Sequence, residues 1–159
     1  SLGTGSVVRP GDVQRMSAGT GVMHSEFNAS ATDSVHFLQI WIVPDRVGVP
    51  PGYEQRSYSA AERTGRLRLV ASPDGADGSV KINQDARLFM SVLLAGQSVT
   101  HEPGPDRHAW VQVARGALQI QTDGPAALLN TGDGAAISCE RKVTIHANEE
   151  SEFLLFDLP

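Results

Sequence analysis

Residues 86–101, ARLFMSVLLAGQSVTH, contain two strand-like runs, Ala86–Leu94 and Gln97–His101, separated by the turn signal Ala95-Gly96. Runs of β-branched and other apolar residues that end at a glycine turn are typical of short strands. Turn signals recur about every 8–12 residues from here to the C-terminus, which is the rhythm of a β-sandwich or small barrel. We therefore expect an all-β jelly-roll lobe over residues 61–159, with strands at 67–71, 80–82, 86–94, 97–101, 109–114, 118–122, 126–129, 135–138, 143–146 and 152–156.

The part of the chain before this lobe has a different character. Its clearest predicted strand is Val35–Val43, VHFLQIWIV, which ends at Pro44 because proline cannot donate a hydrogen bond to a ladder. Prolines and glycines then mark residues 45–60 as a linker or crossover. About three strands are expected in residues 1–44, too few to close a sandwich alone. The predicted division is thus 1–44, 45–60 and 61–159.

Composition excludes several classes of partner. The chain has 159 residues, with 13 Lys and Arg against 18 Asp and Glu, and no run of basic residues that could follow a phosphate backbone. We expect no direct nucleic-acid partner. No apolar stretch approaches the ~18 residues of a membrane span, and the segment Ser1–Ser6 lacks the apolar core of a signal peptide. With one cysteine, the sequence predicts a soluble cytoplasmic protein without a membrane partner.

Candidate metal ligands lie in the segment Gly19–Asn28, GTGVMHSEFN. On an extended chain His24 and Glu26 point to the same side, with Cα atoms roughly 6.5 Å apart, so both side chains can reach one ion. Imidazole and carboxylate together suit iron(II), manganese, copper, nickel or zinc. An isolated His-x-Glu is more often a solvated strand end, so the neighbouring residues decide the interpretation. His36, on the next predicted strand, is a candidate for the pocket or for an outer contact to a ligand.

Those neighbouring residues carry a specific resemblance. The pattern Gly21-x-x-His24-x-x-x-Asn28 is similar to the end of the second cupin motif, and the longer string Met16–Asn28, MSAGTGVMHSEFN, resembles the version found in the pirin family. Further segments similar to pirins follow in the same order: Leu38–Ile42, Tyr53–Arg56, Ser72–Gly75 and Leu154–Pro159. The resemblance implies a cupin β-sandwich in a bicupin arrangement with an incomplete first lobe, followed by a second lobe without a metal site.

The same resemblance implies a function. Pirins bind one divalent metal ion, for which the family indicates iron before other metals. His24 and Glu26 match two of the ligands of this ion. The resemblance to bacterial pirins implies that the chain is a quercetin 2,3-dioxygenase, which uses O2 to cleave flavonols. Glu26 would then be both a metal ligand and the catalytic base. The alternative is a metal-binding regulatory protein that acts through protein partners, like the pirin-type transcriptional coregulator. Whether the chain is an enzyme therefore stays open at this stage.

A departure from the family pattern limits these expectations. Pirins carry an earlier His-x-His pair that completes the ligand set, and no such pair occurs in this sequence. Two protein ligands would hold a divalent ion weakly or not at all. The three explanations are a fragment, a second chain that supplies the missing strands of the first cupin, and a shortened natural form without metal. In the second lobe, the segment that contains His101 and His108 resembles a degenerate cupin motif. We expect no metal site there.

Overall fold

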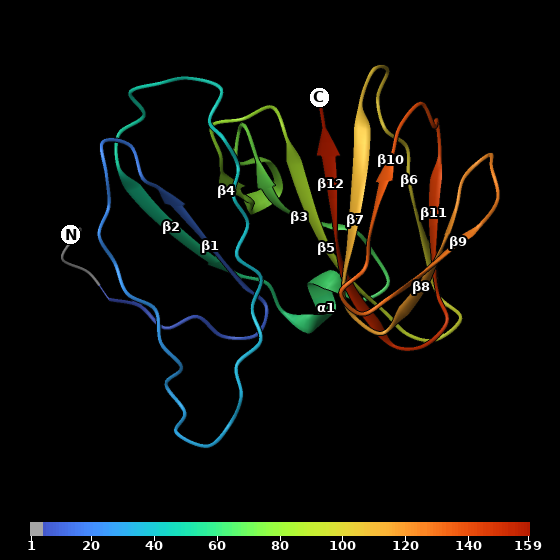
Figure 1. The fold of residues 1–159 in the computed structure, drawn as a ribbon, viewed down its shortest axis with the longest axis horizontal. Coiled ribbons are helices and arrows are strands. Elements are labelled where there is room, and N and C mark those ends of the chain that lie inside the picture. Colours follow the sequence, from blue (N-terminus) through green and yellow to red (C-terminus); the bar gives the residue numbers. More distant parts are fainter. Residues whose placement is uncertain (1–4) are drawn as a thin grey trace.

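The computed structural model describes residues 5–159 and shows two parts that lie side by side (Figure 1). The first part pairs β1 (Asp12–Ser17) with β2 (Gly52–Ser57) in an antiparallel two-stranded sheet. The second part is a sandwich of a six-stranded and a four-stranded sheet. The all-β sandwich expected from the sequence is confirmed. None of the helices in residues 5–159 has the length and apolar character needed to cross a bilayer.

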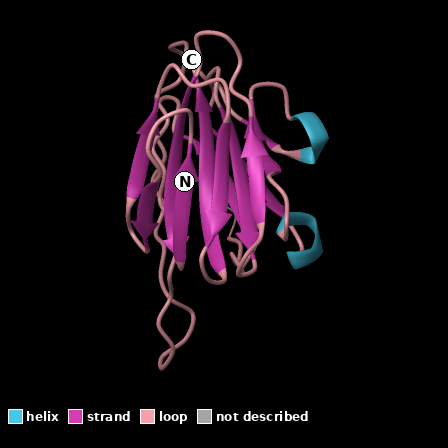
Figure 2. Cartoon of the chain, turned by 90° about the vertical axis from the view of Figure 1, so that its right-hand side faces the viewer, coloured by secondary structure: helices cyan, strands magenta, loops and turns pink. Residues whose placement is uncertain are grey.

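The larger sheet of the sandwich has the order β10-β7-β12-β5-β3-β4, and the smaller has the order β6-β11-β8-β9. All neighbours are antiparallel except β3 and β4. Seen from the side, the strands stand in layers, and one loop of the first part extends well beyond them (Figure 2). The elements of the sandwich and the turn before it are α1 (Ala60–Arg63), β3 (Arg68–Ser72), η1 (Ala76–Gly78), β4 (Val80–Lys81), β5 (Arg87–Leu93), β6 (Ser98–His101), β7 (His108–Arg115), β8 (Ala117–Gln121), β9 (Ala127–Asn130), β10 (Gly134–Ile137), β11 (Val143–Ala147) and β12 (Ser151–Leu158).

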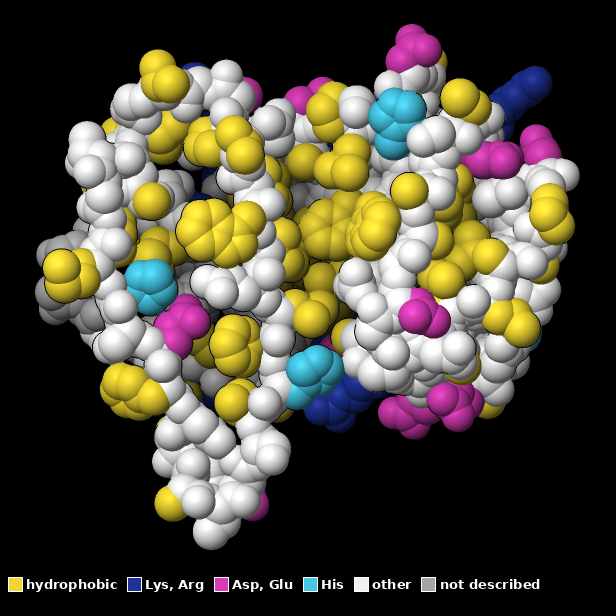
Figure 3. Space-filling view, viewed as in Figure 1, with side chains coloured by type: hydrophobic (Ala, Val, Ile, Leu, Met, Phe, Trp, Pro, Cys, Tyr) yellow, Lys and Arg dark blue, Asp and Glu magenta, His cyan; other side chains and the backbone are white. Residues whose placement is uncertain are grey.

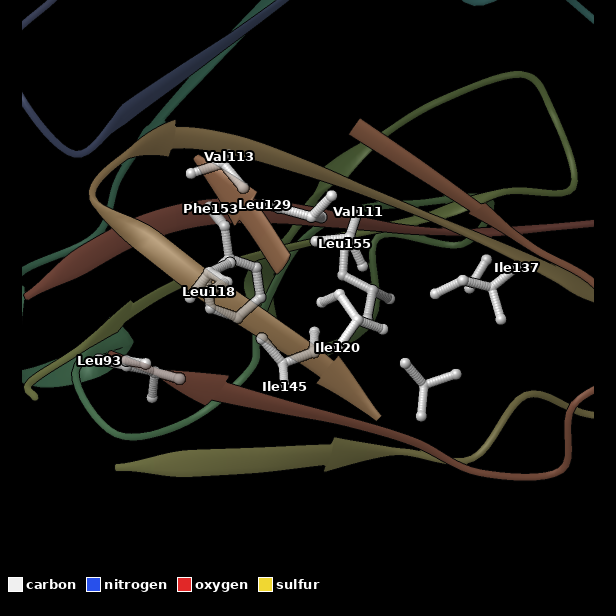
Figure 4. Close-up of a cluster of buried hydrophobic side chains, with 13 residues drawn as sticks. Leu93, Val111, Val113, Leu118, Ile120, Leu129, Ile137, Ile145, Phe153 and Leu155 are labelled. Atoms are coloured by element: carbon white, nitrogen blue, oxygen red, sulfur yellow. The ribbon is translucent and has the colours of Figure 1, made fainter. Parts of the chain in front are cut away.

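The main hydrophobic core fills the space between these two sheets (Figure 4). Period-two alternation sends Phe153 and Leu155 of β12 inward, where both are fully buried. Ile145 of β11 and Leu118 of β8 meet them from the smaller sheet. Each fully buried side chain of this size contributes roughly 1.5–3 kcal/mol relative to exposure. The sandwich therefore has the core it needs within its own residues.

A second cluster covers the outer face of the larger sheet and joins the first part to the sandwich. Val13 of β1 and Ile42 pack, partly buried, against a group that includes Val70 and Leu154. Polar contacts support the junction. The carboxylate of Glu54 on β2 accepts hydrogen bonds from the guanidinium of Arg15 at 3.3 Å and from the backbone N–H of Lys81 at 3.1 Å.

The structure differs from the expectations for the first part in three respects. Val35–Val43 is not a strand: it is irregular, and no described strand pairs with it. Strand-forming side chains do not make a strand unless a neighbour satisfies the backbone groups. Only β1 precedes residue 44 within residues 5–159, where about three strands were expected, and β2 lies inside the stretch expected to be a linker. Each strand predicted between 67 and 156 is present within two residues of its expected bounds.

The division into 1–44, 45–60 and 61–159 stays a prediction, and its residues 1–4 lie outside the described residues.

Candidate metal site

His24 and Glu26 lie in the long irregular connection between β1 and β2. The Nε2 atom of His24 is 3.7 Å from the Oε1 atom of Glu26, so the two donors converge on one point. The side chains are 42% and 45% exposed, which leaves this point open to solvent. The pair has the chemistry of part of a metal site: a neutral imidazole nitrogen and a carboxylate oxygen are both common ligands of divalent transition metals.

Glycines shape the backbone before this pair. Gly19 has φ +54° and Gly21 has φ +129°, and a turn places the N–H of Gly21 2.8 Å from the carbonyl oxygen of Ala18. A Cβ atom on Gly19 would come within 2.4 Å of the carbonyl oxygen of Val49. Only glycine fits this close approach. The turn thus fixes the start of the His24 segment against the residues that lead into β2.

The described residues supply only these two donors at the site. Nowhere in residues 5–159 do three or more His, Cys, Asp or Glu side chains gather closely enough to hold an ion. His36 is exposed, and among the described residues no hydrogen bond, ion pair or ring contact joins it to His24 or Glu26. The donor set therefore fits a metal as two of its ligands. The assignment of His24, Glu26 and His36 as site residues stays a prediction.

Apolar side chains are concentrated around this connection. Phe27 is 85% exposed and Trp41 is 88% exposed. Hydrophobic side chains gather along the middle of the face shown in Figure 3, between the two parts. A hollow of about 200 Å³ lies there, lined by Leu38 and Ile40 of the connection and by Trp110 and Phe156 of the sandwich. This surface could hold a flat apolar ligand or a protein segment.

The sandwich contains a buried polar network that sequence reasoning missed. The Nε2 atom of His101 is 2.9 Å from Oδ2 of Asp157, and the Nε–H of Arg107 donates to the other oxygen of the same carboxylate. Arg107 also pairs with Asp85 at 3.0 Å. Burial alone would lower the pKa of Arg107, but its hydrogen bonds to the two carboxylates outweigh this and raise it.

A sequence signal for this network did exist. Asp157 has the same strand parity as the fully buried Phe153 and Leu155, so alternation places a carboxylate on the inward face. A carboxylate in that position needs a partner.

Comparisons with known proteins agree with this architecture. Residues 69–158 match the family model described as "Quercetinase C-terminal cupin domain", and residues 1–42 match the model described as "Pirin". A quercetin 2,3-dioxygenase of Escherichia coli K12 is 45% identical over 159 residues, which cover all of this chain and 66% of that protein. A pirin-like protein of Caulobacter vibrioides is 35% identical over a similar span.

Solved structures show the same relation. The crystal structure of YhhW from Escherichia coli matches with a TM-score of 0.89 and 44% identity, covering 100% of this chain and 65% of that one. A structure of the bacterial pirin YhhW in complex with nickel(II), also from Escherichia coli, matches with a TM-score of 0.82 and 44% identity, covering 94% of this chain and 62% of that one. The chain thus spans about two thirds of the length of these relatives.

Proposed function

The chain belongs to the pirin family, and we propose that it carries part of the metal site of a metal-dependent dioxygenase that cleaves flavonols such as quercetin. The observation that carries the proposal is the convergence of His24 Nε2 and Glu26 Oε1 at 3.7 Å within a pirin-type motif. The activity named for the Escherichia coli relative supports the substrate class. The nickel(II) in the structure of YhhW supports a divalent ion as the cofactor, for which iron(II) is our first candidate.

Each residue has a distinct role in this proposal. His24 and Glu26 would hold the ion, which when bound supplies Lewis acidity that lowers the pKa of a flavonol hydroxyl. Glu26 accepts the proton from that hydroxyl at a carboxylate oxygen, acting as the general base. The half-exposed position of both side chains leaves room for a substrate to approach. The apolar hollow beside Trp110 and Phe156 offers a surface for flat rings.

Loss of the visible absorbance of quercetin, measured with the Fe(II)-loaded chain, tests the proposed reaction. We expect Glu26→Gln to lower the rate by at least about 100-fold, because general-base catalysis contributes on the order of 10²–10⁴. Glu150→Gln is the matched control, since Glu150 is exposed in the turn before β12. Equal rates for Glu26→Gln and the unchanged chain would rule out Glu26 as the base.

Calorimetric titration with Ni(II) separates metal binding from turnover. We expect His24→Ala and Glu26→Gln each to weaken binding, whereas His108→Ala, which changes an exposed histidine at the start of β7, should leave it unchanged. Binding that survives the double change His24→Ala with Glu26→Gln would place the metal elsewhere and end the proposal.

A second candidate is a regulatory protein that acts through protein partners. The exposed Phe27 and Trp41 favour it, because large exposed apolar side chains grouped on one segment often mark interaction surfaces. The run Val35–Val43, which pairs with no strand of residues 5–159, would suit a partner strand, including one from a second chain. Pull-downs with the apo and the metal-loaded chain distinguish the candidates. Partner binding that changes with metal, without loss of quercetin, favours regulation.

A further inference from the structure

The edge of the larger sheet contains a second hollow, of about 490 Å³, that shares no residue with the metal motif. It is formed by the loop before β3, by β3 itself, by η1 and by the start of β5. Its lining combines an apolar floor, made by Leu67, Leu69 and Phe89, with the arginines Arg66 and Arg87. Its volume is within the range of small-molecule sites, and six of its ten lining residues are charged.

The guanidinium of Arg87 keeps unused hydrogen-bond donors although a carboxylate lies opposite it in the sheet. Arg87 lies opposite Asp157 in the ladder between β5 and β12. Both oxygens of that carboxylate are taken by His101 and Arg107. Asp74 also lines the hollow, but its carboxylate accepts hydrogen bonds from the Ser72 hydroxyl at 2.9 Å and the Ala76 N–H at 3.1 Å. The guanidinium of Arg87 thus makes no hydrogen bond or ion pair with residues 5–159, although its charge attracts that of Asp74 and helps to lower the pKa of Asp74.

Arg66 is free for a similar reason. Glu62, the acidic residue nearest in sequence, has Oε2 2.8 Å from the N–H of Ser59 and 2.7 Å from its hydroxyl, so it is held in the capping box of α1. Arg66 is exposed and has no hydrogen-bond or ion-pair partner among the described residues. Two guanidinium groups with unused donors therefore line one hollow.

The charges of the lining set the expected polarity. A third arginine, Arg68, also lines the hollow; its guanidinium donates to the carbonyl oxygen of Asp77 at 2.7 Å and pairs with Glu62 at 3.9 Å. The formal charges of the three arginines and of the three lining acids, Glu62, Asp74 and Asp77, cancel. Two of the acids are engaged in the hydrogen bonds just described, whereas exposed Asp77 has none for its carboxylate within the described part of the chain. All three acids oppose an incoming anion, because the hydrogen bonds of Glu62 and Asp74 lower their pKa values and keep them ionised; Asp77 is the one whose carboxylate can be changed without the loss of a described hydrogen bond.

The floor of the hollow is rigidly supported. Leu69 and Phe89 are direct neighbours across β3 and β5, which gives a continuous apolar surface. The ring of His101 packs on Phe89 at a centroid distance of 5.5 Å, and Asp157 holds His101. The buried network therefore both fixes the aromatic floor and leaves Arg87 without its carboxylate.

We propose that this hollow binds a small aromatic carboxylate, whose ring lies on Phe89, Leu67 and Leu69 and whose carboxylate pairs with Arg66 and Arg87. Guanidinium groups match carboxylates in geometry and charge, and an aromatic ring gains from contact with the apolar floor. The neutral amide of the same acid would lose the charge-assisted hydrogen bonds. Inorganic phosphate would lose the contact with the floor.

An NMR titration of the ¹⁵N-labelled full chain with benzoate tests the proposal, with benzamide and inorganic phosphate as parallel probes. We expect saturable shifts from benzoate in β3 and β5, and at least about tenfold weaker binding of either other probe. Arg87→Gln and Arg66→Gln should each weaken benzoate binding by about tenfold, because each removes one charged pair. Arg141→Gln, an exposed arginine in the loop before β11, should leave it unchanged.

Asp77→Asn should have the opposite effect on benzoate binding from the two arginine substitutions. Removal of this opposing charge should tighten benzoate binding by about twofold to fivefold, an effect that added salt reduces. Absence of saturable shifts with millimolar benzoate would overturn the proposal, as would equal binding of benzamide. Phosphate binding as tight as that of benzoate would refute the aromatic part. Because Arg66 lies in an exposed loop, Arg66→Gln tests the site without risk to the sheet.

Discussion

The connection between β1 and β2 and the sandwich that follows it place similar side chains in opposite environments. Trp41 and Phe27 of the connection are 88% and 85% exposed, whereas Phe153 of β12 is fully buried. Val35–Val43 is as rich in strand-forming residues as β12, yet only β12 has neighbours on both sides, β5 and β7. The difference teaches that the partner strand, more than the intrinsic preference of the residues, decides whether such a run becomes a strand.

The largest expected difference between the sandwich and the connection is the change in the free energy of unfolding when an aromatic side chain is removed from each. Phe153→Ala removes a side chain from the centre of the core and should lower the free energy of unfolding by about 3–5 kcal/mol. Trp41→Ala changes an exposed side chain and should alter it by about 0.5 kcal/mol or less. Urea denaturation followed by circular dichroism measures both. Similar losses for the two variants would mean that the connection is packed in solution.

A smaller difference is expected when a glycine with positive φ is replaced by alanine in each of the two regions. Gly116, between β7 and β8, has φ +84°, and a Cβ there would lie 2.4 Å from the hydroxyl oxygen of Ser151. Gly116→Ala should therefore cost at least about 1–3 kcal/mol. Gly48 in the connection has φ +74°, but no atom lies within 4 Å of the position that an added Cβ would take, so Gly48→Ala should cost only the backbone strain of about 1–2 kcal/mol, whereas Gly116→Ala adds a steric clash to that strain. Thermal melting compares the two, and a larger loss for Gly48→Ala would contradict the assignment.

The smallest effect concerns acid and the β1–β2 pair. The hydrogen bond from the Ser57 hydroxyl is the main reason that the pKa of Asp12 is lowered, with further help from the N–H of Arg9 and the side chain of Gln55. A lowered pKa stabilises the folded form above the unfolded value of 3.8, and this contribution is lost as pH falls through the folded pKa. The β1–β2 pair should thus loosen in acid, below about pH 4.

Amide exchange of β1 and β2, followed by NMR as pH is lowered, measures this effect. Asp12→Asn should reduce the acid dependence, and Asp123→Asn, at an exposed turn, should not. Glu54 acts in the same direction: burial raises its pKa, but hydrogen bonds from Lys81, Arg15 and Arg56 together lower it. If the amide protection of β1 and β2 at low pH equals that at neutral pH, the carboxylates do not have this role.

The sequence predicted the sandwich well because each of its strands finds partners within residues 61–159. Glycine turns such as Ala95-Gly96 and the apolar alternation of β12 are local signals, and the sheets follow from them. It failed at Val35–Val43, because a local pattern does not reveal whether a partner strand is present. It also missed β2, since the mixed polar run Gly52–Ser57 follows two prolines and lacks a strand-like apolar pattern.

The candidate metal ligands could be predicted from the sequence, but the buried polar network of the sandwich could not. Spacing and motif context identified His24 and Glu26, and the 3.7 Å separation of their donor atoms is compatible with that prediction. The network of His101, Arg107 and Asp157 depends on three segments distant in sequence, so only the inward parity of Asp157 hinted at it. The lack of an ion pair between Arg87 and Asp157 follows from that network and could not be foreseen from one strand.

The central position of β12 also has a consequence for biosynthesis. This strand, Ser151–Leu158, separates β5 from β7 in the larger sheet and supplies Phe153 and Leu155 to the core. A ribosome makes β5 and β7 well before β12, so neither can complete its ladder until the end of the sandwich has emerged. Until then both strands expose open edges that favour aggregation. Nascent sandwiches should therefore depend on holding chaperones, and a premature stop before residue 151 should leave an insoluble product.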